Sequence, residues 1–180
     1  MEFWLERGVD GFRVDVVNLY SKNPEYQDVD VKDERAKFQR ADKHYTNGPG
    51  MHEWRKEMRR ESMDKYGEVM LVGELPHTDS REEILSYISA AERELLIVFD
   101  FDATAKHEWF KPSLPDFKQT FVKAQDLLVG TDAWTTVFLD NHNQQRSINR
   151  FTTDDPKYRV KAGKVLAMLL ATLSRTLFLY

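Results

Sequence analysis

The 180-residue sequence contains no cysteine and has only eight glycines and six prolines. The absence of cysteine excludes disulfides, a thiol nucleophile and thiolate metal ligands. The low glycine and proline content, together with 41% hydrophobic residues, excludes a disordered chain and is typical of one globular domain. No apolar run reaches membrane-spanning length, and the first residues lack the pattern of a secretory signal. We therefore expect a cytoplasmic protein without a membrane partner.

The sequence also lacks a surplus of positive charge, because 26 Lys and Arg residues are outnumbered by 30 Asp and Glu residues and the formal net charge is −4. Nucleic-acid binding needs a surplus of clustered cations, so no nucleic-acid partner is expected. The basic run 54–60 is interleaved with Glu53, Glu57 and Glu61. We interpret this run as the solvated face of a helix.

Short apolar runs alternate along the chain with helical patterns. The runs are 11–17, 68–75, 95–101, 135–140 and 176–180, and the helical patterns are 51–66, 80–91, 117–128 and 157–174. The runs are almost continuously apolar, which predicts strands buried on both faces, as in parallel sheets. The first helical pattern places Met51, Trp54 and Met58 on one side. This alternation predicts an α/β fold, in which the long polar segment 18–50 is the least regular part.

Polar side chains stand at the carboxyl ends of these runs, where parallel α/β folds place reactive groups. Arg13 and Asp15 are expected on one face of the first strand, where the cation keeps the carboxylate ionised. That arrangement suits a nucleophile, and a buried structural ion pair explains it equally well. Glu74 lies at the end of the second run, next to apolar residues. Such surroundings raise the pKa of a carboxyl group, which suits a general acid. A helix cap or an ion pair is an equal alternative for Glu74.

The loop after the fourth run carries His142 and Arg146, which are hydrogen-bond donors when charged. A single histidine in such a loop is more often simply packed. An ionised Asp and a Glu of raised pKa nevertheless supply two carboxylates with two roles, which is what glycoside hydrolysis requires. The same loop holds Asn143, which raises the question of whether this amide stands where a third carboxylate is expected.

Four stretches of the sequence resemble one known family. They are "GVDGFRVDVVNLYSK" (8–22), "NGPGMHEW" (47–54), "VGEL" (72–75) and "FLDNHNQQRSINRF" (138–151). In order and spacing they are similar to motifs of the α-amylase-type glycoside hydrolases, in the maltase, isomaltase and oligo-1,6-glucosidase branch. The resemblance covers essentially the whole chain. It implies a (β/α)8 TIM barrel and retaining hydrolysis of terminal α-linked glucose in maltose- or isomaltose-like oligosaccharides.

The resemblance also implies roles for individual residues. Asp15 would be the nucleophile, Glu74 the general acid and base, and Arg13 the residue that orients Asp15. His142 and Arg146 would bind the sugar. Val16 directly follows the nucleophile, as in the α-1,6-preferring members, and weakly favours isomaltose over maltose.

Three positions depart from the family pattern. Asn143 stands where the family has Asp, and an amide has no negative charge to stabilise a developing oxocarbenium ion. Gly50 replaces the usual Arg, and Asp140 replaces the usual Glu. We therefore expect Asn143 to take the catalytic position with reduced efficiency.

The matched motifs correspond to barrel strands four through eight. A complete barrel needs roughly 250 residues, so residues 1–180 are expected to form an unclosed fragment of the catalytic domain. The N-terminal barrel half, the inserted domain and the C-terminal β domain would then be absent from the chain. No cofactor and no metal site are expected, and the sequence does not indicate an oligomeric state.

Two other classes of protein remain open. The chain could be a catalytically inactive relic or a partial gene product that binds sugar weakly at most. An unrelated, doubly wound α/β binding protein is the remote alternative, because no glycine-rich phosphate loop follows the first strand.

Overall fold

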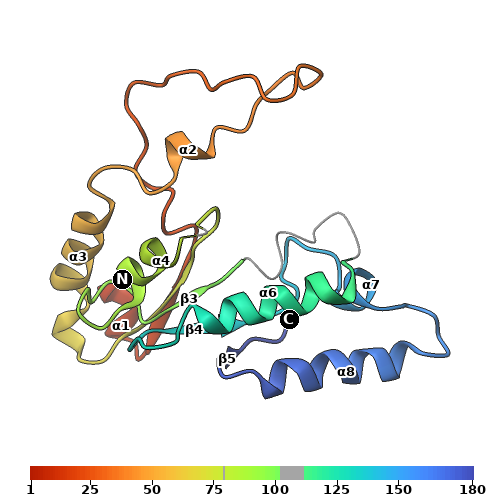
Figure 1. Ribbon diagram of the computed structural model, residues 1–180. Helices are drawn as coiled ribbons and strands as arrows, with labels where there is room; N and C mark the ends of the chain where they lie inside the picture. The colour runs from red at the N-terminus through yellow and green to blue at the C-terminus, as the bar shows by residue number, and fades with distance from the viewer. Residues whose placement is uncertain (79, 102–111) are drawn as a thin grey trace. The chain divides into compact units, whose positions relative to one another are not determined.

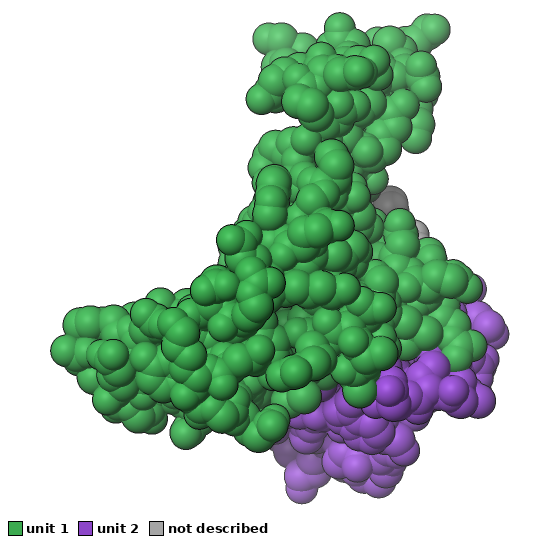
Figure 2. Space-filling model, turned by 90° about the vertical axis from the view of Figure 1, so that its left-hand side faces the viewer, with its two compact units in different colours: residues 1–96 green, residues 97–180 purple. Residues whose placement is uncertain are grey.

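The computed structural model describes residues 1–78, 80–101 and 112–180 (Figure 1). The chain forms two compact units, residues 1–96 and residues 97–180, which are coloured separately in Figure 2. Each unit combines parallel strands with helices, as the alternating pattern of the sequence predicts. The α/β class is therefore confirmed.

In the first unit, β1 (Gly11–Val14) pairs in parallel with β2 (Met70–Glu74), and Gly11 is opposite Met70. The helices of this unit are α1 (Glu2–Leu5), α2 (Asp42–Tyr45), α3 (Met51–Ser62), the 3₁₀ turn η1 (Asp64–Tyr66) and α4 (Arg81–Ile88). Its core includes Val17, Met51, Leu71 and Tyr87, each at most 2% exposed. This core supports the loops that follow the two strands.

In the second unit, β3 (Ile97–Phe99) pairs with β4 (Trp134–Val137), which pairs with β5 (Thr176–Leu177), and both pairings are parallel. Its described residues form the helices α6 (Leu114–Asp126), α7 (Ser147–Phe151) and α8 (Arg159–Thr172). Phe121 of α6 and Leu166 and Leu170 of α8 pack with Val137 and Leu139 in the core. The second unit thus also has an α/β core of its own.

All five predicted strands and all four predicted helices form, with the strands shorter than the apolar runs. Two helices begin where their sequences supply a cap. The side chains of Ser80 and Ser113 each accept a hydrogen bond from the backbone N–H three residues later, which satisfies one free donor at the helix end. Segment 18–50 is irregular apart from α2, as predicted (Figure 1).

Helix α3 corrects one prediction. Arg55, from the basic run that was expected to be solvated, is only 2% exposed, and the apolar Trp54 is 53% exposed. The buried side of α3 is therefore defined by Met51 and Arg55, which are four residues apart and lie on one helical face. Strand β1 also differs from the expectation of burial on both faces, because its residues are only partly buried and Arg13 is exposed.

Candidate active site

The end of β1 presents Arg13 and Asp15, the first two residues of the candidate site. The strand ends at Val14, so Asp15 opens the following turn and does not lie within the strand as expected. The predicted ion pair between Arg13 and Asp15 is present. The side chain of Asp15 is 67% exposed, and its backbone carbonyl accepts a 2.6 Å hydrogen bond from the Tyr20 hydroxyl. Asp15 is therefore accessible to a substrate while its backbone is held in place.

Glu74 is the last residue of β2 and is only 7% exposed. Burial raises the pKa of its carboxyl group, and a hydrogen bond with the Asp15 carboxyl raises that pKa further. The positive charge of Arg13 opposes both effects. The prediction of a carboxyl group with raised pKa at this strand end is thus confirmed, with burial as the main cause.

One guanidinium bridges the two carboxyl groups. Arg13 pairs with Asp15 through Nη1 and with Glu74 through Nη2. Parallel pairing places Arg13 opposite Val72, two residues before Glu74, which lets the long side chain reach both acids. The shared cation and the hydrogen bond with Asp15 therefore act in opposite directions on the pKa of Glu74.

Val16 has a left-handed backbone conformation, with φ of 34°. This conformation is strained for a β-branched residue and is most often found at functional sites. Its N–H donates to Glu74 Oε2 at 3.4 Å, and the N–H of Val17 donates to the Glu74 carbonyl at 2.8 Å. The turn after β1 is thus fixed to the end of β2.

Buried side chains hold this turn through hydrogen bonds. Arg55 donates through Nε to the carbonyl of Val17 at 3.1 Å, and its guanidinium lies 5.3 Å from the centre of the Tyr20 ring. Asn18 is fully buried and donates to the Pro76 carbonyl at 2.6 Å and to Thr78 Oγ1 at 2.9 Å. No local pattern distinguishes Arg55, Tyr20 and Asn18 from ordinary helix and loop residues, so the sequence does not predict their place at the site.

The remaining predicted residues follow β4 in the second unit. His142, Asn143 and Arg146 are exposed and share one loop, in which the backbone N–H of Asn143 donates to Asn141 Oδ1 at 2.9 Å. In the part of the chain that the structure describes, the Asn143 side chain has no hydrogen-bond partner. It is therefore available for an external ligand.

The comparison with known proteins is decisive for the family. Residues 1–180 match the family described as the catalytic domain of alpha amylase. The chain belongs to the alpha-amylase family.

Curated relatives within the alpha-amylase family include an alpha-glucosidase of Candida albicans, which is 41% identical over 187 residues. An oligo-1,6-glucosidase of Parageobacillus thermoglucosidasius is 42% identical over 187 residues. Each alignment covers 100% of this chain and 32% of the relative. The chain therefore spans about a third of the length of these relatives.

Solved structures give the same assignment. The trehalose-6-phosphate hydrolase of Bacillus licheniformis has a TM-score of 0.81 and 32% identity, and the match covers 99% of this chain and 32% of that one. An isomaltulose synthase variant of Erwinia rhapontici, in complex with sucrose, has a TM-score of 0.84 and 30% identity with the same coverage. The chain thus has the fold of part of an alpha-amylase-family TIM barrel.

Two departures from the alpha-amylase pattern have a structural explanation. Gly50 precedes α3 with φ of 77°, and a Cβ there would lie 3.3 Å from the Trp54 ring, so an Arg in this conformation would be strained. Asp140 is 9% exposed and accepts a 2.7 Å hydrogen bond from the N–H of Ser147, the first residue of α7. Asp140 therefore supports the start of α7, and Arg146 Nε lies 3.8 Å from it.

Across the described ranges 1–78, 80–101 and 112–180, no group of three or more His, Asp or Glu residues is arranged to hold a metal ion. The same ranges contain no helix with the length and hydropathy needed to cross a membrane.

Proposed function

We propose that these residues carry the catalytic carboxylates of a retaining α-glucosidase. The observation that supports this most directly is the bridge from Arg13 to both Asp15 and Glu74. Retaining glycosidases need one ionised and one protonated carboxyl group close together. Here the exposed Asp15 is the nucleophile, and the buried Glu74, with its raised pKa, is the acid.

In this mechanism the Asp15 carboxylate attacks the anomeric carbon of the terminal glucose while Glu74 protonates the departing glycosidic oxygen. Glu74, now ionised, then removes a proton from the water that hydrolyses the glucosyl ester of Asp15. Arg13 contacts both carboxyl groups and keeps them next to each other in both steps. The fixed turn at Val16 limits the movement of the nucleophile, and such positioning accounts for several kcal/mol of a catalytic barrier.

The partner in this reaction is a small α-glucoside of the maltose or isomaltose type. His142 and Arg146 bind sugar hydroxyls, Asn143 takes the position of the third carboxylate, and Val16 favours isomaltose. One relative is named an alpha-glucosidase and another an oligo-1,6-glucosidase, and these names support an α-glucoside as the substrate. We place the reaction in the cytoplasm, which agrees with the absence of cysteine.

We also propose that β1–β5 are the fourth to eighth strands of a (β/α)8 barrel and that residues 1–180 are one fragment of its catalytic domain. The first three strands, an inserted domain and a C-terminal β domain would lie outside these residues. The 32% coverage of the relatives supports this division.

Asn143 favours a second candidate function, sugar binding without efficient turnover. Its amide keeps the hydrogen-bonding capacity of an aspartate but lacks the charge that stabilises the transition state. A hydrolase and a sugar-binding protein would differ in turnover, but both would bind the same chemical class of ligand.

The proposal is tested in a chimera in which residues 1–180 replace the matching third of the oligo-1,6-glucosidase of Parageobacillus thermoglucosidasius. Glu74→Gln should lower turnover about 10²- to 10⁴-fold, the usual contribution of a general acid. With azide, Asp15→Gly should form β-glucosyl azide, because the small anion enters the space of the missing nucleophile. A β-anomer as the first hydrolysis product, or full activity of Glu74→Gln, would contradict the proposal.

A further inference from the structure

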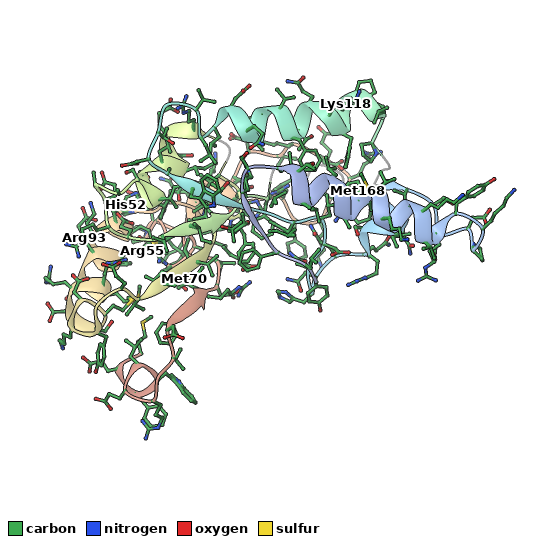
Figure 3. All side chains as sticks on the ribbon, turned by 90° about the horizontal axis from the view of Figure 1, so that it is seen from below. His52, Arg55, Met70, Arg93, Lys118 and Met168 are labelled. Atoms are coloured by element: carbon green, nitrogen blue, oxygen red, sulfur yellow. The ribbon has the colours of Figure 1, made fainter. Side chains whose placement is uncertain are left out.

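A hollow of about 210 Å³ lies in the first unit and is lined only by charged residues. The lining consists of Lys56, Arg59 and Arg60 of α3, Asp64 of η1, and Glu92 and Arg93 of the turn after α4. Figure 3 shows Arg93 near α3, on the same side of the molecule as His52 and Arg55. Four cations thus face two carboxylates, although the whole chain carries a net charge of −4.

Within the described part of the chain, the guanidinium groups of the hollow keep most of their donors unused. Arg59 contacts Asp64 Oδ1 through Nε at 3.3 Å, and Arg93 contacts the same oxygen through Nη2 at 3.4 Å. Arg60 contacts Glu61 through Nε at 2.8 Å. A guanidinium has five N–H donors. Within the described residues, each of these side chains engages another side chain through a single nitrogen, so several charged donors remain for a ligand.

The backbone also brings these donors together. Arg59 is only 14% exposed, so its charge is held at the wall of the hollow. Arg93 has a left-handed backbone, with φ of 52°, a conformation that costs energy for a residue other than glycine. Asp64 holds Arg59 and Arg93 around one oxygen. The two guanidinium groups are therefore positioned next to each other despite their like charge.

Lys56 is the fourth cation that lines the hollow. Its Nζ lies 2.6 Å from Glu92 and 3.7 Å from Glu94. The hydrogen bond with Glu92 raises the pKa of Lys56, so the ammonium group stays charged. Lys56 and Arg60 are four residues apart on α3 and lie on the same helical face.

We propose that this hollow binds a phosphoryl group, either as free phosphate or on a small phosphorylated sugar. Paired guanidinium groups match the oxygens of a tetrahedral phosphate and bind it through charge-assisted hydrogen bonds. A water molecule occupies about 30 Å³ in the liquid, so the hollow has room for the phosphoryl group and part of the molecule that carries it. This site is separate from Asp15 and Glu74 and does not depend on the proposed hydrolysis.

The test is isothermal titration of the 180-residue chain with inorganic phosphate, glucose 6-phosphate and glucose, all at one ionic strength. Phosphate and glucose 6-phosphate should bind, and glucose should not bind at this site. Arg93→Gln should weaken binding at least about tenfold, because it removes charged donors. The control Arg35→Gln makes the same change at a 91% exposed side chain in segment 18–50 and should have no effect.

A second pair of variants should change the affinity for phosphate in the opposite direction. Asp64→Asn removes the carboxylate that competes for Arg59 and Arg93, so it should strengthen phosphate binding, whereas Asp33→Asn should leave it unchanged. If Arg93→Gln does not fold, Arg60→Gln serves in its place, since the Arg60 side chain is 65% exposed. Tighter binding of glucose 6-phosphate would identify a sugar phosphate as the ligand, and equal affinities would identify free phosphate. Absence of binding, or equal losses in Arg93→Gln and Arg35→Gln, would overturn the proposal.

Discussion

Arg13, on β1, forms an ion pair with Glu74 at the end of the neighbouring strand β2. The same guanidinium also pairs with the exposed Asp15. Its positive charge therefore lowers the pKa of Glu74, whereas burial and the hydrogen bond to Asp15 raise that pKa. Two substitutions can separate these influences.

The first prediction concerns the pKa of Glu74. Arg13→Gln removes a nearby positive charge and should raise the pKa further. Asp15→Asn removes a neighbouring carboxyl group that raises this pKa, so it should lower it. Carbon-detected NMR titration of the Glu74 carboxyl group measures both shifts, with Arg35→Gln as a distant charge control. Shifts of the same sign in both variants would contradict the bridged arrangement.

The second prediction concerns Asn143. In the chimera with the oligo-1,6-glucosidase, Asn143→Asp should raise turnover at least roughly a hundredfold, the scale of one preorganised transition-state contact. The neighbouring Asn141→Asp serves as the control and should not produce this gain, since Asn141 holds the loop through the N–H of Asn143. Turnover numbers for isomaltose decide the matter. Equal rates with Asn and Asp at position 143 would mean that Asn143 is an ordinary loop residue.

The third prediction concerns the packing beneath the candidate site. A Cβ at Gly73 would lie 2.7 Å from Leu95 Cδ1 and 2.8 Å from Val17 Cγ1. Gly73→Ala should therefore destabilise the protein by about 1–3 kcal/mol through overpacking. Gly163→Ala, within α8, brings the new Cβ to 3.4 Å from Ile148 Cδ1, an ordinary contact, and should stabilise the protein by roughly 0.5–1 kcal/mol. Urea unfolding compares the two variants, and equal effects would contradict the close approach at Gly73.

The fourth prediction concerns stability as a function of pH. Glu94 is fully buried beside His52 Nδ1 at 2.9 Å, and burial raises the pKa of its carboxyl group. Its folded-state pKa exceeds the unfolded value, so its contribution is fully present below the unfolded pKa and is lost as pH rises through the folded pKa.

Glu94→Gln lacks this titration and should therefore lose less stability than the wild type as pH rises above the unfolded pKa of a glutamate. Urea unfolding at several pH values measures the difference, with the exposed Glu57→Gln of α3 as the control. A stability difference between wild type and Glu94→Gln that does not change with pH would show that burial does not control this carboxyl group.

The sequence by itself determined the order and type of the main elements. Apolar runs of β-branched and aromatic residues became β1–β5, and the amphipathic patterns became α3, α4, α6 and α8. The raised pKa of Glu74 also follows the local pattern, in which a carboxyl group ends an almost continuously apolar strand. These features depend on residues that are close together in the chain.

Only the tertiary structure decided which distant groups meet. Arg13 reaches Glu74 because parallel pairing places β1 beside β2. Local composition favours exposure for an arginine in a basic run, but Arg55 is buried and donates to the carbonyl of Val17, 38 residues away. Pairing register and long-range hydrogen bonds, which have no local sequence pattern, therefore determined which groups surround Glu74 and which side chains support the turn after β1.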